Sequence, residues 1–456
     1  MPSEKFRRFL CRAYRSSAVF EPWGIWRFTR AGILVLIMLI ASAFIGLDTR
    51  ATVVYRGFTL LFMLLLIAFL WSLFFRIRLT INRTLPRFGT VGETLEYRIS
   101  IRNDTAQVQQ GLSLCDNVAD SLPTEEEFAS TPEPGEERRN LYDRTLLVYR
   151  WYWLIARKQG VKMKEHVIPR LGPHEEVDIT IPVTPLRRGY IRLADVTIMR
   201  PDPFNLYKAF VRIPLPQSLL ILPKRYLLPP IQLPGTRKFK LGGVALASSV
   251  GDSEEFMSLR DYRPGDPLRH IHWKSWAKTH KPVVKEFQAE YFVRHALVLD
   301  TFQQVGYSDV FEEAVSLAAS FACTISTQES LLDLLFVGPE AYCFTVGRGL
   351  GYTEQMLEIL AEVKPCQDRV FTALPPIVLE RASLLSGCIC ILLAWDEERQ
   401  QFIRVLQELN IPLMVFVITD TQAVHTLDRG PMQNAPERFH PLEVGKIEEG
   451  LNSIAL

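Results

Sequence analysis

Hydrophobic and polar residues alternate in two stretches of the first half of the chain. Positions 95, 97, 99 and 101 are apolar or aromatic and the positions between them are charged or polar, and residues 177–184 repeat this pattern. Residues 191–193 continue it briefly, with Gly and Pro between the runs. A period of two indicates half-buried antiparallel strands. We therefore expect a β-sandwich domain over residues 76–225, interrupted by an insertion at 120–165.

The insertion lacks this alternation. Pro123–Arg139 is acidic and rich in turn-forming residues, which predicts a mobile loop. Leu146–Ile155 is apolar and aromatic but too short to span a membrane. It fits an amphipathic helix on the membrane surface, and it fits a buried helix or strand of the sandwich just as well. Membrane contact of residues 140–157 stays an open alternative.

Two uncharged apolar runs precede the sandwich. Ala31–Leu47 and Gly57–Phe75 are each close to the ~20 residues that cross a bilayer. The linker between them is short, so we expect a transmembrane α-hairpin over residues 31–75, with the lipid bilayer as a partner. A cleaved signal peptide competes with this interpretation, because residues 41–43 resemble a cleavage site. The second run would still anchor the chain.

Lysine and arginine gather on both flanks of the expected hairpin. The tail over residues 1–30 carries seven of them and residues 76–87 carry four, whereas the linker 48–56 carries two. Positive charge remains on the cytoplasmic side of membrane proteins. The sequence therefore predicts a plasma (inner) membrane protein with two spans and both termini in the cytoplasm.

Strand-like and helix-like patterns alternate over residues 293–456. Apolar runs at 295–299 and 388–394 are examples of the strands, and segments with helical periodicity separate such runs. The alternation predicts a doubly wound α/β sheet of mainly parallel strands. Asp300 and Asp396 follow two of these strands. Ligands of such sheets bind at the carboxyl ends of the strands, where both acids would lie.

Charge and cysteine content narrow the possible functions. The formal net charge of the 456-residue chain is +2, which gives no support for nucleic-acid binding. The seven cysteines are odd in number and include no Cys-x-x-Cys pair, which favours reduced thiols over disulfides or a zinc site. Cys388 and Cys390 are two positions apart, so a strand would place both on one face.

Residues 226–292 contain a linker rich in Pro and Gly and then a dense segment of charges and aromatics. Residues 255–278 read EFMSLRDYRPGDPLRHIHWKSWAK. Arg263-Pro264-Gly265-Asp266 predicts a turn, and Asp266 would cap a helical turn that begins at Pro267. The candidate docking residues of the segment are Glu255, Arg260, Asp261, Tyr262, Gly265, Asp266, Arg269, His272, Trp273 and Lys274.

These side chains fit two kinds of site. As chemistry, Asp261, Asp266 and His272 could form an acid/base or metal site. As structure, the arginines would pair with the carboxylates, while Tyr262 and Trp273 anchor the segment between two domains. The segment has no zinc-ligand, nucleophile or phosphate-loop motif. We therefore favour the docking role and assign no catalytic residue.

The segment resembles the signature of the domain-of-unknown-function 58 family, with its acidic-Phe pair, Leu-Arg-x-Tyr, Pro-Gly-Asp and the following Arg and Trp. The apolar hairpin and Asp202-Pro203-Phe204 fit the same resemblance. It covers most of the chain from residue 31 and implies a C-terminal domain similar to the von Willebrand factor A domain. Relatives often accompany MoxR-type AAA+ ATPases, so such an ATPase is the implied cytoplasmic partner.

An A-type domain implies a metal site with Asp-x-Ser-x-Ser after the first strand, a later Thr and a final Asp. In this chain Asp300, Thr353 and Asp396 match the acids and the Thr, but Phe302 and Gln304 replace the serines. A phenyl ring cannot coordinate Mg²⁺, which requires near-octahedral oxygen ligands. We expect a degraded site without tight Mg²⁺ binding, and no other cofactor.

The patterns together predict a non-catalytic, membrane-anchored assembly or adaptor protein that presents its A-type domain to a cytoplasmic protein. One alternative is a metal-assisted hydrolase centred on Asp261, Asp266 and His272. Another is an envelope-biogenesis factor whose sandwich or hairpin binds membrane proteins.

Overall fold

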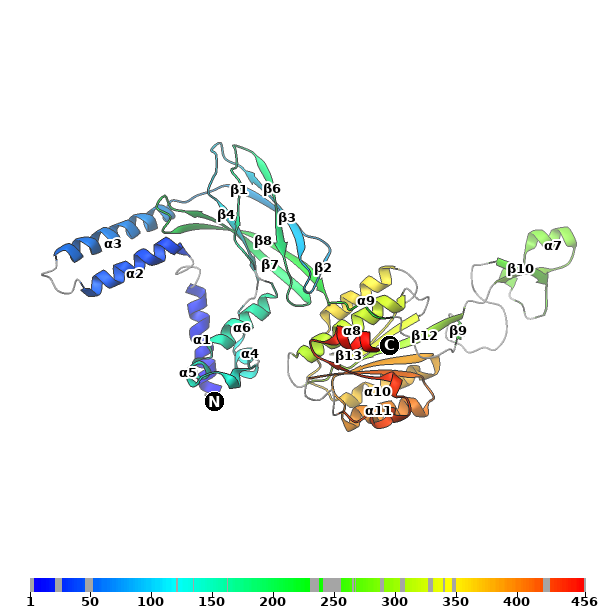
Figure 1. Ribbon diagram of the computed structural model, residues 1–456. Coiled ribbons are helices and arrows are strands. Elements are labelled where there is room, and N and C mark those ends of the chain that lie inside the picture. Colours follow the sequence, from blue (N-terminus) through cyan, green and yellow to red (C-terminus); the bar gives the residue numbers. More distant parts are fainter. Residues whose placement is uncertain are drawn as a thin grey trace. The chain divides into compact units, whose positions relative to one another are not determined.

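The computed structural model describes residues 4–20, 27–45, 52–119, 122–133, 135–161, 163–229, 238–240, 256–264, 266, 268–287, 291–303, 308–326, 331–338, 341–346, 350–420 and 427–454. The chain divides into two compact units, Met1–Leu222 and Pro223–Leu456. Figure 1 shows the helices and strands of both units. Each unit has its own hydrophobic core.

Two antiparallel sheets form the β domain of the first unit. One sheet has the order β1 (Leu79–Thr84), β3 (Leu95–Asn103), β6 (Glu176–Val183). The other has the order β2 (Phe88–Thr90), β8 (Lys208–Leu222), β7 (Gly189–Pro201), β4 (Ser113–Val118), β5 (His166–Val167), with β2 parallel to β8. Tyr97, Ile99 and Ile101 of β3 are buried in a core shared with both sheets. The alternation in the sequence therefore predicted the sandwich correctly.

A buried ion pair lies inside this sandwich. The Arg83 guanidinium donates to the Asp116 carboxylate, and both side chains are almost completely buried. The hydroxyl of Tyr97 donates to the other oxygen of Asp116, at 2.5 Å. Burial and the adjacent carboxylate raise the pKa of Tyr97 far above its ordinary value, so the phenol remains protonated.

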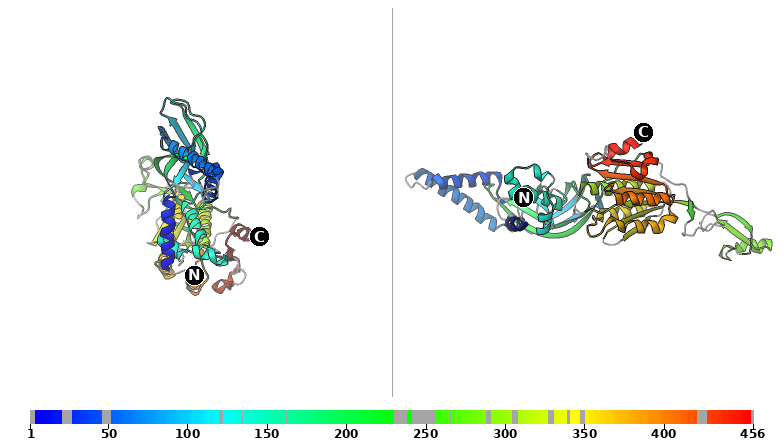
Figure 2. Two further views of the ribbon diagram at one scale, coloured as in Figure 1. Left: turned by 90° about the vertical axis from the view of Figure 1, so that its left-hand side faces the viewer. Right: turned by 90° about the horizontal axis from the view of Figure 1, so that it is seen from below.

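The apolar hairpin consists of α2 (Arg30–Ile45) and α3 (Thr52–Leu73), which lie side by side (Figure 1 and Figure 2). Residues Val54–Leu73 are long and apolar enough to cross a bilayer. The 16 residues of α2 are also apolar, but they rise only ~24 Å at ~1.5 Å per residue, less than the ~30 Å hydrocarbon core. The described residues therefore contain one helix that could span a membrane.

The base of the hairpin packs on the loop that contains the Asp-Pro-Phe element. The buried carboxylate of Asp202 accepts hydrogen bonds from three backbone N–H groups of this loop. The N–H of Thr29 donates to the carbonyl of Leu206 at 3.0 Å. A Cβ at Gly32 would lie 2.0 Å from that carbonyl oxygen, so this close approach of α2 to the loop requires glycine.

The N-terminal tail forms helix α1 (Glu4–Phe20), which packs against helices of the insertion. These are α4 (Glu125–Ser130), α5 (Leu141–Leu146) and α6 (Val148–Gln159). The prediction of a mobile loop over 123–139 is wrong, because Thr124 and Glu127 form a capping box that begins α4. The apolar stretch 146–155 lies mainly in α6 and packs on α1 through its buried face, outside the sandwich.

One mixed sheet organises the second unit. Its order is β14 (Ala341–Val346), β13 (Leu331–Val337), β12 (Tyr291–Leu299), β15 (Gly387–Leu392), β16 (Leu413–Thr419), β17 (Phe439–Glu443). β14 is antiparallel to its neighbour, the next five strands are parallel, and β9 (Lys238–Lys240) pairs antiparallel with β12. The sheet of mostly parallel strands agrees with the prediction from the sequence.

Helices cover both faces of this sheet (Figure 1). α8 (Asp309–Ser326) and α9 (Leu350–Glu362) lie on one side. α10 (Pro375–Arg381) and α11 (Glu397–Glu408) lie on the other, where their apolar side chains share a core with the strands. Cys388 and Cys390 point to this same face, with their sulfur atoms 3.5 Å apart. α12 (Ile447–Ile454) packs beside β17.

Candidate functional site

The charged and aromatic segment folds into a small unit of its own, which we call the signature unit (residues 256–287). Strands β10 (Phe256–Asp261) and β11 (Val283–Phe287) pair antiparallel. Between them lie a 3-10 turn, η4 (Leu268–His270), and the helix α7 (Trp273–Thr279). Buried Ile271, Val283 and Val284 are the apolar centre of the unit.

Arg260 and Asp266 hold the turn of this unit together. The guanidinium of Arg260 donates two hydrogen bonds of 2.8 Å to the two carboxylate oxygens of Asp266. The backbone N–H of Arg263 donates a third, also 2.8 Å. These bonds lower the pKa of Asp266 to about 2, and the side-chain hydrogen bond from Arg260 contributes most to the shift. Pairing of arginine with this carboxylate is what the structural interpretation of the sequence anticipated.

Asp266 does not cap the helix that follows. The residue before α7 is His272, and η4 separates α7 from the turn. The prediction of one helical turn that carries both Arg269 and Trp273 is therefore wrong, and its expected first residue, Pro267, lies outside the described residues. The Asp266 carboxylate closes the turn at Arg263 instead, because its oxygens already accept from Arg260 and the Arg263 amide.

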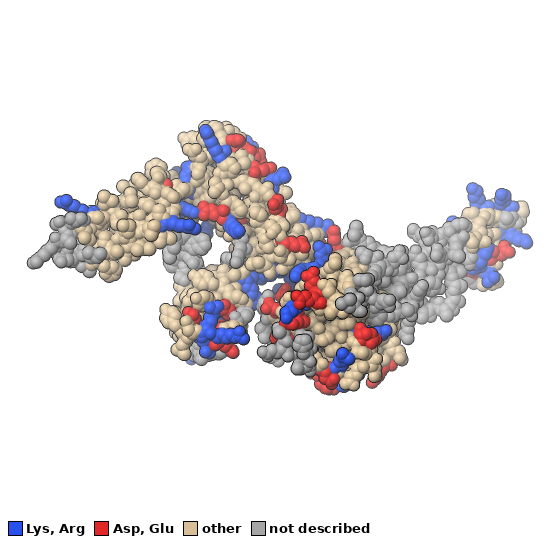
Figure 3. All heavy atoms as spheres, viewed as in Figure 1, with Lys and Arg blue, Asp and Glu red and all other residues tan. Residues whose placement is uncertain are grey.

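The exposed side of α7 presents tryptophan and lysine. Trp273 is 63% exposed and stacks on Trp276, with ring centroids 5.3 Å apart. Lys274 and Lys278 are exposed on the same short helix, and Lys281 follows it. Basic side chains dominate the visible surface of the signature unit (Figure 3). Trp273 was expected to be a packed anchor, and this is wrong because most of its surface is exposed.

Two of the three residues proposed for chemistry, His272 and Asp266, have other partners in the described part of the unit. Nδ1 of His272 lies 2.6 Å from the hydroxyl of Ser275, and Asp266 is bonded to Arg260. Asp261 is exposed at the end of β10, and half-buried Tyr262 donates its backbone N–H to the carbonyl of Pro282. Glu255 and Gly265 lie outside the described residues, and so does the side chain of Arg269.

A second cluster lies at the carboxyl ends of β12 and β15. Asp300 is completely buried, and its carboxylate accepts from Nε of Arg399 (2.6 Å) and from the backbone N–H groups of Phe302 and Leu393 (3.0 Å each). Nη1 of Arg399 donates to Asp396 at 2.5 Å. The sequence predicted that the two acids fall at this edge, but it did not predict that an arginine joins them.

Burial and neighbouring charges shift the pKa values of Asp300 and Arg399 in opposite directions. Burial raises the pKa of Asp300, against the pull of the Arg399 guanidinium and of the two backbone donors. Burial also disfavours the charged form of Arg399, but the carboxylates of Asp300 and Asp396 outweigh it and raise the pKa of Arg399. Arg399 follows Asp396 by three positions in a new helix, and this spacing is the signal that could have revealed the pair.

Thr353, the third residue expected at a metal site, lies on α9. In the described part of the chain neither Asp300 nor Asp396 is hydrogen-bonded to it. No group of three metal-ligating side chains is found among the described residues either. The structure thus joins the two acids through Arg399.

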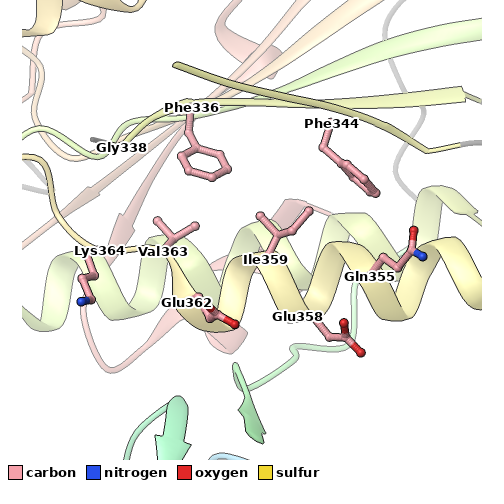
Figure 4. A pocket seen from close by; sticks show the side chains of 9 residues that line it. All are labelled: Phe336, Gly338, Phe344, Gln355, Glu358, Ile359, Glu362, Val363 and Lys364. Carbon is pink, nitrogen blue, oxygen red and sulfur yellow. The ribbon is translucent and has the colours of Figure 1, made fainter. Parts of the chain in front are cut away.

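A pocket of about 670 Å³ lies between the β13–β14 edge and α9 (Figure 4). Phe336 and Phe344 point from the strands toward Ile359 and Val363 of the helix. Gln355, Glu358, Glu362 and Lys364 line the same pocket. The lining is mainly apolar with acidic groups, and its described side chains include no nucleophile paired with a base.

Comparison with known proteins identifies part of the second unit. Residues 258–375 match the family described as "Protein of unknown function DUF58". This part of the chain is similar to the DUF58 family. The resemblance inferred from the signature is thereby confirmed for these residues. The DUF58 match includes most of the signature unit and the strands β12, β13 and β14, and it ends before Asp396 and Arg399.

A curated relative is similar to about a quarter of this chain. The "Uncharacterized protein YeaD" of Bacillus subtilis (strain 168) is 32% identical over 104 residues. The alignment covers 23% of this chain and 25% of YeaD, so the chain matches about a quarter of the relative's length.

Solved structures resemble the chain only distantly. The CARDB domain of PF1109 from Pyrococcus furiosus is 14% identical, with 31% of this chain and 93% of that domain covered and a TM-score of 0.17. The ASH / PapD-like domain of human CEP192 is also 14% identical, with 32% and 86% covered and a TM-score of 0.17.

Proposed function

We propose that this DUF58 protein is a non-catalytic, membrane-anchored adaptor that docks a cytoplasmic protein through its signature unit. The observation that carries the proposal is exposed Trp273, which stacks on half-buried Trp276 and is flanked on the same short helix by exposed Lys274 and Lys278. Tryptophan supplies much of the energy of protein interfaces. Lysines around it favour a partner with an acidic surface.

The framework of the unit supports docking rather than catalysis. The Arg260–Asp266 pair stabilises the turn, and the low pKa of Asp266 keeps it ionised, so it is unsuited to act as a general acid near neutral pH. Nδ1 of His272 is hydrogen-bonded to Ser275. Two of the three groups expected to cooperate in a hydrolase, Asp266 and His272, are thus engaged with separate partners.

Packing in the first unit supports two membrane crossings. α1 precedes the hairpin and the β domain follows it, yet α1 packs against helices inserted in that domain. The two flanks of the hairpin must then lie on one side of the membrane. A crossing by α3 alone would place the two flanks on opposite sides, so α2 crosses as well. The apolar sequence continues beyond α2 to Leu47, which adds to the length available for this crossing. The basic flanks make the shared side cytoplasmic.

The proposed partner is a MoxR-type AAA+ ATPase, as the family resemblance implies. Binding can be measured with the purified ATPase of the same cell and the full-length protein in membranes. Trp273→Ala and Lys274→Glu should each weaken capture at least tenfold. Lys446→Glu, another exposed lysine of the second unit, should leave it unchanged. Capture that survives both substitutions would refute docking through α7, and binding to anionic vesicles instead would identify the lipid surface as the partner.

Two further measurements test the remaining parts of the proposal. A reporter fused after Leu456 should be cytoplasmic, and a highly active alkaline phosphatase fusion would contradict that. His272→Ala should preserve cellular function. If this variant folds and binds the ATPase but abolishes function, the enzyme alternative is correct.

A further inference from the structure

The acids Asp300 and Asp396 lie where a doubly wound sheet is expected to bind a ligand. β12 and β15 are parallel neighbours in the middle of the sheet. After β12 the chain continues to β13 on one side, whereas β15 lies on the other, so the strand order reverses at this point. Ligands bind at the carboxyl ends of strands at such a switch point. In this chain the guanidinium of Arg399 lies there between the two acids.

The residues present do not fit a divalent metal ion. Asp300 Oδ1 accepts from the amide of Phe302, and Oδ2 accepts from Arg399 and the amide of Leu393. Asp396 Oδ1 accepts from the amide of Arg399, and its other oxygen accepts from the guanidinium. Every carboxylate oxygen of the pair therefore already has an N–H donor. A cation would have to displace a positive charge, and Mg²⁺ needs a near-octahedral set of free oxygen ligands.

Aromatic packing holds Arg399 in this position. Its guanidinium carbon lies 4.7 Å from the centre of the Phe371 ring, within the range of a cation–π contact. Phe302 is buried and meets Phe371 edge to face at 5.8 Å. The phenyl group at position 302, where a metal site would need a hydroxyl, therefore helps to build the wall against which the arginine rests.

We propose that Arg399 is an internal cation that takes the place of a divalent metal at the carboxyl end of this sheet. The guanidinium links the loops after β12 and β15, as a shared ion would, and it carries the charge that buried Asp300 requires. The cluster is complete without any added ion. Whatever binds this end of the domain does so independently of Mg²⁺. The inference does not depend on docking through α7.

Thermal unfolding of the full-length protein in detergent tests the proposal. The midpoint of the wild type should be the same with a chelator and with millimolar Mg²⁺. Arg399→Ala should lower it by about 6 to 20 °C, because a buried carboxylate loses its partner. The matched control is Arg404→Ala on the same helix. The Arg404 side chain is 40% exposed and pairs with exposed Glu397, so this substitution should change the midpoint little.

A double substitution separates charge pairing from mere packing. Asp300→Asn combined with Arg399→Ala should recover part of the midpoint that Arg399→Ala loses, because it removes the uncompensated charge. An equal loss for Arg399→Ala and Arg404→Ala would overturn the proposal. Direct Mn²⁺ titration of the wild type is a test that needs no variant to fold. No micromolar binding is the expected result, and micromolar binding would overturn the proposal.

Discussion

Replacing Trp151 by alanine should release helix α1 from the insertion. Trp151 is 5% exposed and packs in one cluster with Leu10 and Cys11 of α1 and with Phe128. Its ring centre lies 5.6 Å from that of Tyr14. Truncation of a buried tryptophan costs about 3–5 kcal/mol. A free-energy change of about 1.4 kcal/mol changes an equilibrium constant by a factor of ten. If the whole loss falls on the contact between α1 and the insertion, the population of molecules with α1 released should grow about 100- to 5,000-fold.

The buried thiol of Cys11 reports this opening. Cys11 is 0% exposed, and burial raises the pKa of its thiol, so both access and the reactive thiolate are suppressed in the closed state. Labelling of Cys11 in native membranes can be followed by peptide mass spectrometry, which separates it from the other six cysteines. The labelling rate should rise with the open population, because reaction occurs from locally opened molecules.

Tyr152 provides the matched control on the same helix. It is 57% exposed, so Tyr152→Ala should change the labelling rate of Cys11 by no more than about twofold. If Trp151→Ala labels no faster than the control, α1 does not depend on this cluster. The argument that both flanks of the hairpin lie on one side of the membrane would then lose its basis.

Two further predictions concern the hairpin base and the signature unit. Gly32→Ala should lower the thermal midpoint of the full-length protein, because the added Cβ would meet the Leu206 carbonyl. Gly57→Ala is the control and should leave the midpoint unchanged, because a Cβ there would have nothing within 4 Å. Equal midpoints for the two variants would contradict the close approach of α2 to the loop. The folded-state pKa of Asp266, about 2, lies below the ordinary 3.8, so its stabilising contribution is complete above about pH 4 and is lost as the pH falls toward 2. Hydrogen exchange over residues 256–287, corrected for intrinsic rates, should show this loss of stability at low pH. In Arg260→Met the loss should begin at a higher pH. The same pH profile in both proteins would refute the role of Arg260.

Local patterns predicted many of the elements. The alternation at 95–101 predicted β3, because side chains on a strand face opposite sides at every step. The apolar runs predicted α2 and α3, and the βα alternation predicted the parallel sheet, since each depends only on neighbours along the chain. The acidic region 123–139 misled the prediction, because its carboxylates favour the start of a helix as much as they favour solvent.

Contacts between distant residues were decided only by the tertiary structure. Arg399 meets Asp300 across 99 positions because β15 takes its place beside β12, and periodicity does not specify that order. Tyr14 reaches Leu146 across 132 positions for the same kind of reason. Trp273 shows the converse, since a residue type that is usually buried lies exposed on a unit too small to cover it. A sequence specifies which faces are apolar, but the strand order and the size of each core determine which faces become covered.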